Sequence, residues 1–187
     1  MRKYLRFFRL VYGIQEPFDI LLDAGFLTEC FKYKIEIYDR LAKLLQCSEV
    51  RLYVLRSTLK ALQSGSLSSG EAHQFVISRC KVVDDDHLTD ESPSLRLVSY
   101  HRKVHEEYLN SQSKTKVRRY FVATQDGDVR TSLRMIPGVP LIYTNKVTLV
   151  LEPPSEASRN FNLKVIEAEK TRLNDNEKVV VEKARYP

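Results

Sequence analysis

Long apolar runs and paired cysteines are what this sequence most conspicuously lacks. The apolar stretches are short, such as those at 20–22 and 148–151, and none approaches the roughly 18 residues that a membrane-spanning helix needs. The basic N-terminus is not followed by an apolar segment and a cleavage site, so we expect no secretory signal. Cys30, Cys47 and Cys80 are scattered and odd in number, which excludes a disulfide scaffold and favours free thiols in the cytosol or nucleus.

The composition is that of a globular protein. The 187 residues are 43% hydrophobic and 29% charged, which is enough to bury a core in one domain of ordinary size with a terminal extension. The net charge of +6 favours an acidic partner, most often a nucleic acid, although a basic surface also serves solubility alone.

The first nine residues combine positive charge with aromatic rings and contain no acidic residue. Cations beside aromatic faces suit phosphate contacts and base stacking. A second interpretation, compatible with the first, is an amphipathic segment that packs its aromatic side chains on the protein's own core. The basic residues are Arg2, Lys3, Arg6 and Arg9.

Short apolar runs bounded by turn residues predict strands, and apolar residues at helical spacing predict helices between them. The predicted strands are Phe18–Leu22, Leu52–Leu55, Lys81–Val83, Tyr120–Ala123, Leu141–Tyr143 and Val147–Leu151. The predicted helices are Phe26–Phe31, Tyr38–Leu45, Thr58–Gln63, Glu71–Arg79, Pro93–Leu109, Val129–Met135 and one from Ser155 to about Leu173. We also expect Ser57 to cap the third of these helices and 64–70 to form a flexible loop. Alternating strands and helices predict a three-layer α/β fold with a mainly parallel sheet.

Acidic residues follow two of the predicted strands. Asp23 ends the first apolar run, and Asp126 and Asp128 follow the fourth. Ligand chemistry in parallel sheets lies beyond the carboxyl ends of the strands, where converging carboxylates can hold Mg²⁺ or Mn²⁺. The alternative is that each aspartate caps the helix that follows it.

Four motifs give the sequence its resemblance to a known family. They are FDILLDAGF at 18–26, YFVATQDGDVR at 120–130, LRMIPGVPLIY at 133–143 and LVLEPPS at 149–155. In this order and spacing they resemble the PIN-domain ribosome-biogenesis factors, over residues 1 to about 160. The IPGVPLIY turn is shared by the active Fcf1-type endonucleases and the Utp23 type, whereas ThrGlnAsp at 124–126 and the N-terminal segment favour the Utp23 type.

The resemblance implies a PIN-like three-layer sandwich. We expect a basic aromatic N-terminal arm at 1–17, the PIN-like domain at 18–153, and a long C-terminal helix and tail at 154–187.

An active PIN nuclease needs three or four acidic residues, and the resemblance assigns three of them to Asp23, Asp126 and Asp128. The remaining glutamate position falls on Ala61 or Gln63, neither of which carries a charge. We therefore predict a degenerate site and no enzymatic activity. Weak binding of Mg²⁺ or Mn²⁺ remains open, and we expect no other cofactor.

The family's Cys-Cys-His-Cys zinc site is also incomplete. Its cysteine positions fall on Ser57, Asp85 and Arg96, so only His87 matches, with Cys80 a few residues earlier. A structural zinc site needs four ligands, and we predict no zinc. His101 and His105, four residues apart on a predicted helix, could bind a metal, but a basic helix face is the favoured interpretation.

By resemblance, the chain is expected to be a non-catalytic, RNA-binding assembly factor of the small-subunit processome in the nucleolus, acting in early pre-rRNA processing. Its implied partners are pre-rRNA, an H/ACA-class small nucleolar RNA and processome proteins, with no membrane. The predicted RNA-binding residues are Arg2, Lys3, Arg6, Arg9, Arg102, Lys103, Lys114, Lys116, Arg118 and Arg119. The alternatives are an active metal-dependent PIN endoribonuclease and a purely protein-binding scaffold.

Overall fold

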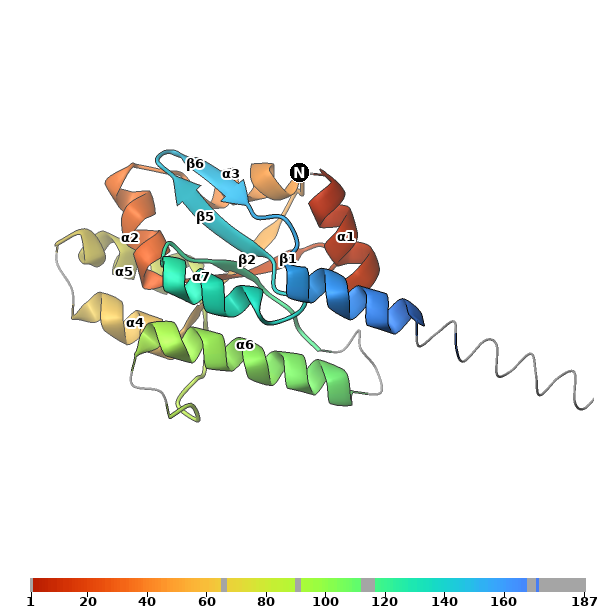
Figure 1. Ribbon diagram of the computed structural model, residues 1–187. Coiled ribbons are helices and arrows are strands. Elements are labelled where there is room, and N and C mark those ends of the chain that lie inside the picture. The colour runs from red at the N-terminus through yellow and green to blue at the C-terminus, as the bar shows by residue number, and fades with distance from the viewer. Residues whose placement is uncertain (1, 65–66, 90–91, 112–116, 168–170, 172–187) are drawn as a thin grey trace, which may run out of the picture.

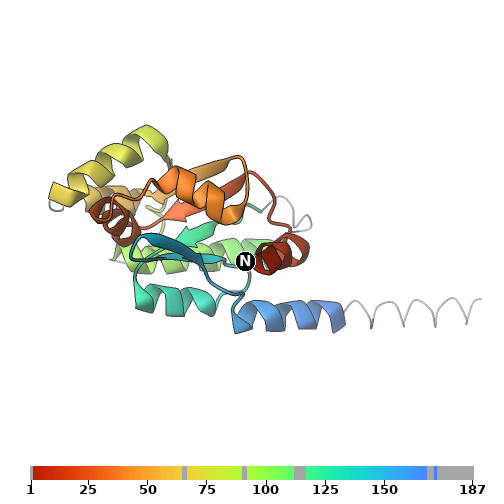
Figure 2. The same ribbon diagram turned by 90° about the horizontal axis from the view of Figure 1, so that it is seen from above.

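A computed structural model describes residues 2–64, 67–89, 92–111, 117–167 and 171, and shows a six-stranded sheet between two layers of helices (Figures 1 and 2). The strands are β1 (Phe18–Leu22), β2 (Val50–Leu55), β3 (Lys81–Val83), β4 (Phe121–Ala123), β5 (Leu141–Asn145) and β6 (Thr148–Leu151). The helices are α1 (Arg2–Tyr12), α2 (Ala24–Lys32), α3 (Ile37–Leu45), α4 (Arg56–Gln63), α5 (Leu67–Arg79), α6 (Pro93–Asn110), α7 (Gly127–Arg134) and the C-terminal helix over 156–167.

The sheet has the strand order β3-β2-β1-β4-β5-β6. Every neighbouring pair is parallel except β5 and β6, which form an antiparallel hairpin. The predicted three-layer α/β fold with a mainly parallel sheet is thus confirmed. The chain winds outward in opposite directions from β1 and β4, so the carboxyl ends of these two strands form the switch point at which such sheets bind ligands.

Alternating residues of the central strands face the two helical layers. Ile20 and Leu22 in β1 pack with α1, α2, α3 and α5, whereas Leu21 between them packs with α6 and α7. Figure 2 shows these two layers on opposite sides of the sheet. All three side chains are fully buried, which explains why β1 appears in the sequence as a continuous apolar run. Within the described ranges, no helix combines the length and apolar character needed to cross a bilayer.

Two local predictions were wrong. Ser57 is the second residue of α4 and not its cap, because Leu55 holds that position. The Ser57 side chain instead donates to Asp85, which lies beyond β3. The helix α5 begins at Leu67, so part of the predicted 64–70 loop is helical.

The cap predicted at Ser155 is present. The backbone N–H of Ser158 donates to Ser155 Oγ at 3.2 Å. The end predicted for this helix near Leu173 lies outside the described residues.

Helix α1 packs its aromatic residues inward. Phe8 is 1% exposed and its ring meets Phe121 of β4 at 6.4 Å, edge to face. Tyr12 stacks on Phe161 of the C-terminal helix at 6.0 Å, so the first and last described helices lie side by side (Figure 1). Core packing, one of the two interpretations of this segment, thus describes Phe8 and Tyr12, whereas Tyr4 and Phe7 are only partly buried.

One buried arginine joins four segments of the chain. The Arg119 guanidinium lies over the rings of Tyr108 and Tyr12, 3.7 and 5.0 Å from their centroids. Its Nη1 donates to the carbonyl oxygens of Pro137 and Gly138. Because Tyr108 belongs to α6 and Tyr12 to α1, the same cation fixes both helices to the 137–140 turn.

Ser158 completes this junction from the C-terminal helix. Its hydroxyl accepts the backbone N–H of Gly138 at 2.9 Å, and its carbonyl accepts the Tyr12 hydroxyl at 2.8 Å. Gly138 has φ +79°, and a Cβ there would overlap Arg119 and Tyr12. Glycine is therefore required in the turn both for its conformation and for the space it leaves.

His101 is a core residue of α6. It is 2% exposed, its Nδ1–H donates to the Leu97 carbonyl at 2.8 Å, and its ring meets those of Tyr100 and Tyr120. Burial, with the nearby charge of Arg119, lowers the His101 pKa to about 4. The basic helix face expected for the His101 and His105 pair is thus wrong for His101, which is neutral and inside.

Replacing Arg119 with alanine tests the junction. Arg119→Ala leaves two carbonyl oxygens of the 137–140 turn without their donor and opens a gap between Tyr12 and Tyr108. We expect a loss of about 3 kcal/mol in the free energy of unfolding, measured by urea denaturation. The control Arg102→Ala, at an exposed position on α6, should change stability by less than about 0.5 kcal/mol. Equal effects of the two substitutions would show that Arg119 does not join these segments.

The buried His101 predicts an acid-sensitive fold. The unfolded chain binds a proton at His101 near pH 6.5 and the folded chain only near pH 4, so stability falls as the pH drops through this window. His101→Leu should remove about 3 kcal/mol of this pH-dependent loss, at ~1.4 kcal/mol per pH unit. The measurement is thermal or urea unfolding from pH 7 to 4, with His87→Ala as an exposed control that keeps the wild-type profile.

Candidate functional site

The carboxyl ends of β1 and β4 bring Asp23 and Asp126 together at the switch point. Asp23 directly follows β1 and is only 5% exposed. Burial raises its pKa, and the nearby charge of Asp126 adds to the rise, while a hydrogen bond from Thr124 opposes it. The Thr124 hydroxyl donates to Asp23 Oδ2 at 3.0 Å. The sequence therefore predicted correctly that these two strands deliver acidic residues to one edge.

Asp126 serves as the N-cap of α7. Its Oδ1 accepts the backbone N–H groups of Asp128 at 2.9 Å and Val129 at 3.1 Å. The capping that the sequence left open as an alternative is thus present at Asp126. Asp128, in the first turn of α7, is exposed.

Gln125, directly before Asp126, forms hydrogen bonds with the neighbouring strand β5. Its Oε1 accepts both the backbone N–H and the hydroxyl of Thr144, and its Nε2 donates to the Thr144 carbonyl, all at 3.0 Å. These contacts fix the loop after β4 against β5. Sequence reasoning used the ThrGlnAsp motif only as a family marker and missed that Thr124 and Gln125 position the loop. The signal was there, because polar residues directly after a buried strand need hydrogen-bond partners.

The acidic residues do not form a ready metal site. Oxygen atoms of Asp23 and Asp126 already accept hydrogen bonds from Thr124 and from the α7 backbone. Throughout the described ranges, no three His, Cys, Asp or Glu side chains are grouped so that they could hold a metal ion. Ala61 and Gln63, at the implied glutamate position, lie on α4 and supply no carboxylate. The residues present therefore do not fit the divalent site of an active PIN nuclease.

The positions of the implied zinc site hold a hydrogen-bonded pair instead. Asp85 is 0% exposed, and its carboxylate accepts both the backbone N–H of Ser57, at 3.1 Å, and the Ser57 hydroxyl. His87 is exposed, and burial raises the pKa of the Cys80 thiol to about 12. A structural zinc site needs four Cys or His ligands, and only Cys80 and His87 stand at or near these positions, so this donor set does not fit zinc.

The four basic residues of α1 all lie exposed on its outer surface. Arg2 Nε donates to Gln46 Oε1 at 3.2 Å, and Arg9 forms an ion pair with Glu16. A groove with a volume of about 520 Å³ is lined by Arg2, Arg6 and Arg9 and by Leu10, which is 73% exposed. Positive charge and an open groove therefore lie on one side of this helix.

The remaining predicted RNA-binding residues are divided. Arg102 and Lys103 are exposed on α6, and Arg118 is exposed before β4. The prediction for Arg119 was wrong, because this residue is 9% exposed and its guanidinium lies over two tyrosine rings. It does not belong to the exposed binding surface. Lys114 and Lys116 lie outside the described residues.

Comparisons with known proteins agree with this fold. The family model described as Fcf1 matches residues 43–153. The protein described as "rRNA-processing protein utp23" from Schizosaccharomyces pombe is 33% identical over 161 residues, which are 84% of this chain and 56% of that protein. The chain thus spans about half the length of this curated relative.

A solved structure shares the fold. The chain described as "Structure of the PIN domain endonuclease Utp24" superposes with a TM-score of 0.62 at 17% sequence identity, covering 74% of this chain and 94% of that one. At this identity the likeness shows the fold alone, and it confirms the predicted PIN-like sandwich. Because the Fcf1 family model matches more than half of the sequence, these findings show that the chain belongs to the Fcf1 family of PIN-domain proteins, as its resemblance to the Utp23 type predicted.

Proposed function

We propose that this chain is a non-catalytic, RNA-binding factor of ribosomal RNA processing. The observation that carries the proposal is that the acidic residues at the switch point form structural hydrogen bonds. Asp126 caps α7, and the buried Asp23 accepts a hydrogen bond from Thr124. The relative described as an rRNA-processing protein supports the process. The fold of a nuclease is kept, while its acidic residues stabilise the fold.

The resemblance to the Utp23 type supports the finer assignment. The chain would act in the small-subunit processome in the nucleolus, where early pre-rRNA processing takes place. Its partners would be pre-rRNA, an H/ACA-class small nucleolar RNA and processome proteins.

Helix α1 supplies the surface that we propose for RNA. Arg2, Arg6 and Arg9 recur at i, i+4 and i+7, so they lie along one face of the helix. Phe8 and Tyr12 anchor the opposite face in the core, which fixes the helix and the row of charges it carries. Such a row can neutralise successive phosphates of a single strand and release their counterions.

An active endoribonuclease is the rival that one observation favours. Asp23 and Asp126 are close enough for their charges to interact, and the repulsion contributes to the raised pKa of Asp23. Paired carboxylates of this kind recruit divalent cations in nucleases. Catalysis also needs the metal and the attacking water held in line, and Ala61 and Gln63 offer no charged ligand for that purpose.

Removing charge from α1 tests RNA binding. We expect Arg2→Gln with Arg6→Gln to lower the slope of log affinity against log salt by about 1.4, because each lost phosphate contact removes about 0.7 for single strands. Fluorescence anisotropy with a labelled single-stranded RNA measures this. The control, Lys60→Gln with Lys146→Gln, removes two exposed charges elsewhere and should keep the wild-type slope. A wild-type chain that does not bind RNA would refute the proposal.

Incubation with RNA in Mn²⁺ tests the absence of catalysis. We expect no cleavage of structured or single-stranded RNA by the wild type or by Asp126→Asn. Asparagine is an equally good N-cap, so this variant keeps α7 in place and changes only the charge. Cleavage by the wild type that is lost in Asp126→Asn would establish the endonuclease instead. Ala61→Glu, which restores the missing carboxylate, should strengthen metal binding.

A further inference from the structure

A polar pocket lies at the edge of the sheet opposite Asp23 and Asp126. It has a volume of about 360 Å³ and is bounded by the segment after α1 and by the residues before β4. We call it the amino-edge pocket, because the amino ends of β1 and β2 form its floor. Its charged lining residues are Asp19, Arg51, Arg118 and Arg119. Arg118 belongs to the RNA-binding set predicted from the sequence, whereas Arg51 and Asp19 do not.

Asp19 holds two of these arginines in place. Arg118 Nε lies 3.2 Å from Asp19 Oδ2, and Arg51 Nη1 lies 3.8 Å from Asp19 Oδ1. The Asp19 side chain is only 11% exposed, whereas those of Arg51 and Arg118 are 40% and 55% exposed. The carboxylate thus holds Arg118 closely and Arg51 in a longer ion pair, and both arginine side chains remain partly open to a ligand.

Arg118 is further oriented by aromatic residues. Its guanidinium lies 5.5 Å from the centroid of the Tyr53 ring, and a hydrogen bond with Tyr120 raises its pKa. A cation held in this way loses little conformational freedom when it binds an anion, which favours affinity. The buried Arg119 also borders the pocket, whose charged lining residues are thus three arginines and one aspartate.

The distribution of charge across the sheet makes this edge attractive to phosphate. Asp23, Asp126 and Asp128 all lie at the carboxyl edge, where they repel an anion. The amino edge carries the excess of arginine and continues directly into α1 through residues 13–17. Arg9, at the end of α1, lies over Phe18 at 5.3 Å, next to the start of β1. Arg9, which is paired with Glu16, thus lies between the outer face of α1 and the amino-edge pocket.

We infer that the amino-edge pocket binds a phosphodiester group of an RNA strand, with Arg51 and Arg118 as its donors. The planar guanidinium presents pairs of N–H groups that match two phosphate oxygens. The volume accommodates a phosphate together with part of its sugar. This inference rests on the proposed function, because the strand that passes along α1 is the one that enters the pocket.

Two arginine substitutions test the inference. With a labelled single-stranded RNA, Arg51→Gln with Arg118→Gln should lower the slope of log affinity against log salt by about 1.4. Over the tenfold range from ~0.1 to ~1 M salt this slope corresponds to a factor of about 25, which is the loss of affinity expected at ~0.1 M. Arg51→Lys with Arg118→Lys keeps both charges and should keep the slope, while it loses affinity with the paired donors. If the two arginines had only a structural role, the glutamine and lysine variants would not differ in salt slope. The comparison of these two variants is therefore decisive.

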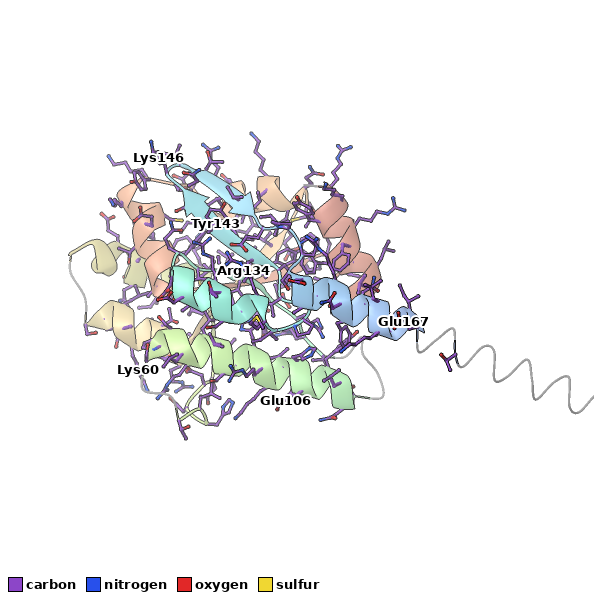
Figure 3. The ribbon with its side chains drawn as sticks, in the orientation of Figure 1. Lys60, Glu106, Arg134, Tyr143, Lys146 and Glu167 are labelled. Carbon is purple, nitrogen blue, oxygen red and sulfur yellow. The ribbon has the colours of Figure 1, made fainter. Side chains whose placement is uncertain are left out.

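The controls separate this inference from the proposed function. Lys60→Gln with Lys146→Gln removes the same charge at the carboxyl edge, where Figure 3 shows both side chains, and should leave binding unchanged. Wild-type RNA binding with unchanged affinity and slope in the Arg51 and Arg118 glutamine variant would overturn the inference and leave the proposed function standing. No binding by the wild type would overturn both. If the double variant does not fold, as judged by circular dichroism, Arg118→Gln alone should still lower the slope by about 0.7.

Discussion

The contact between Arg119 and the rings of Tyr12 and Tyr108 is the interaction on which the arrangement of helices depends. A buried cation must be compensated, and here aromatic faces and two backbone carbonyls do so. Burial lowers the pKa of Arg119, but the tyrosine environment opposes the shift. The partners come from α1, α6 and the 137–140 turn, so the charge of Arg119 is compensated only when all three segments are in place. The C-terminal helix joins them through Ser158.

The two edges of the sheet have acquired different chemistry. At the carboxyl edge, Thr124, Gln125 and Asp126 each form fixed hydrogen bonds, which makes the switch point a rigid connection between β4, β5 and α7. At the amino edge, Arg51 and Arg118 stay partly open to solvent around a half-buried aspartate. A fold known for chemistry at one edge can thus present its accessible cations at the other.

Much of the fold could be predicted from the sequence, because its signals are local. The apolar run at 18–22 specifies a fully buried strand, and Pro93 after Ser92 starts α6 where expected. What could not be predicted depends on distant partners. Ser57 has the side chain of a helix cap, but its position is set by Asp85, 28 residues later. Arg118 and Arg119 are adjacent and chemically identical, and only the packing of Tyr12 and Tyr108 decides that one is exposed and the other buried.

The hydrogen bond between Tyr12 and Ser158 also bears on how the chain folds as it is synthesised. It spans 146 positions, so α1 cannot form this contact until the C-terminal helix has been synthesised. The β1–β2 pairing and the helices between these strands involve much shorter separations and can form earlier. Helix α1 is therefore made before the other described helices, and Tyr12 at its end must wait for its partner until the C-terminal helix arrives.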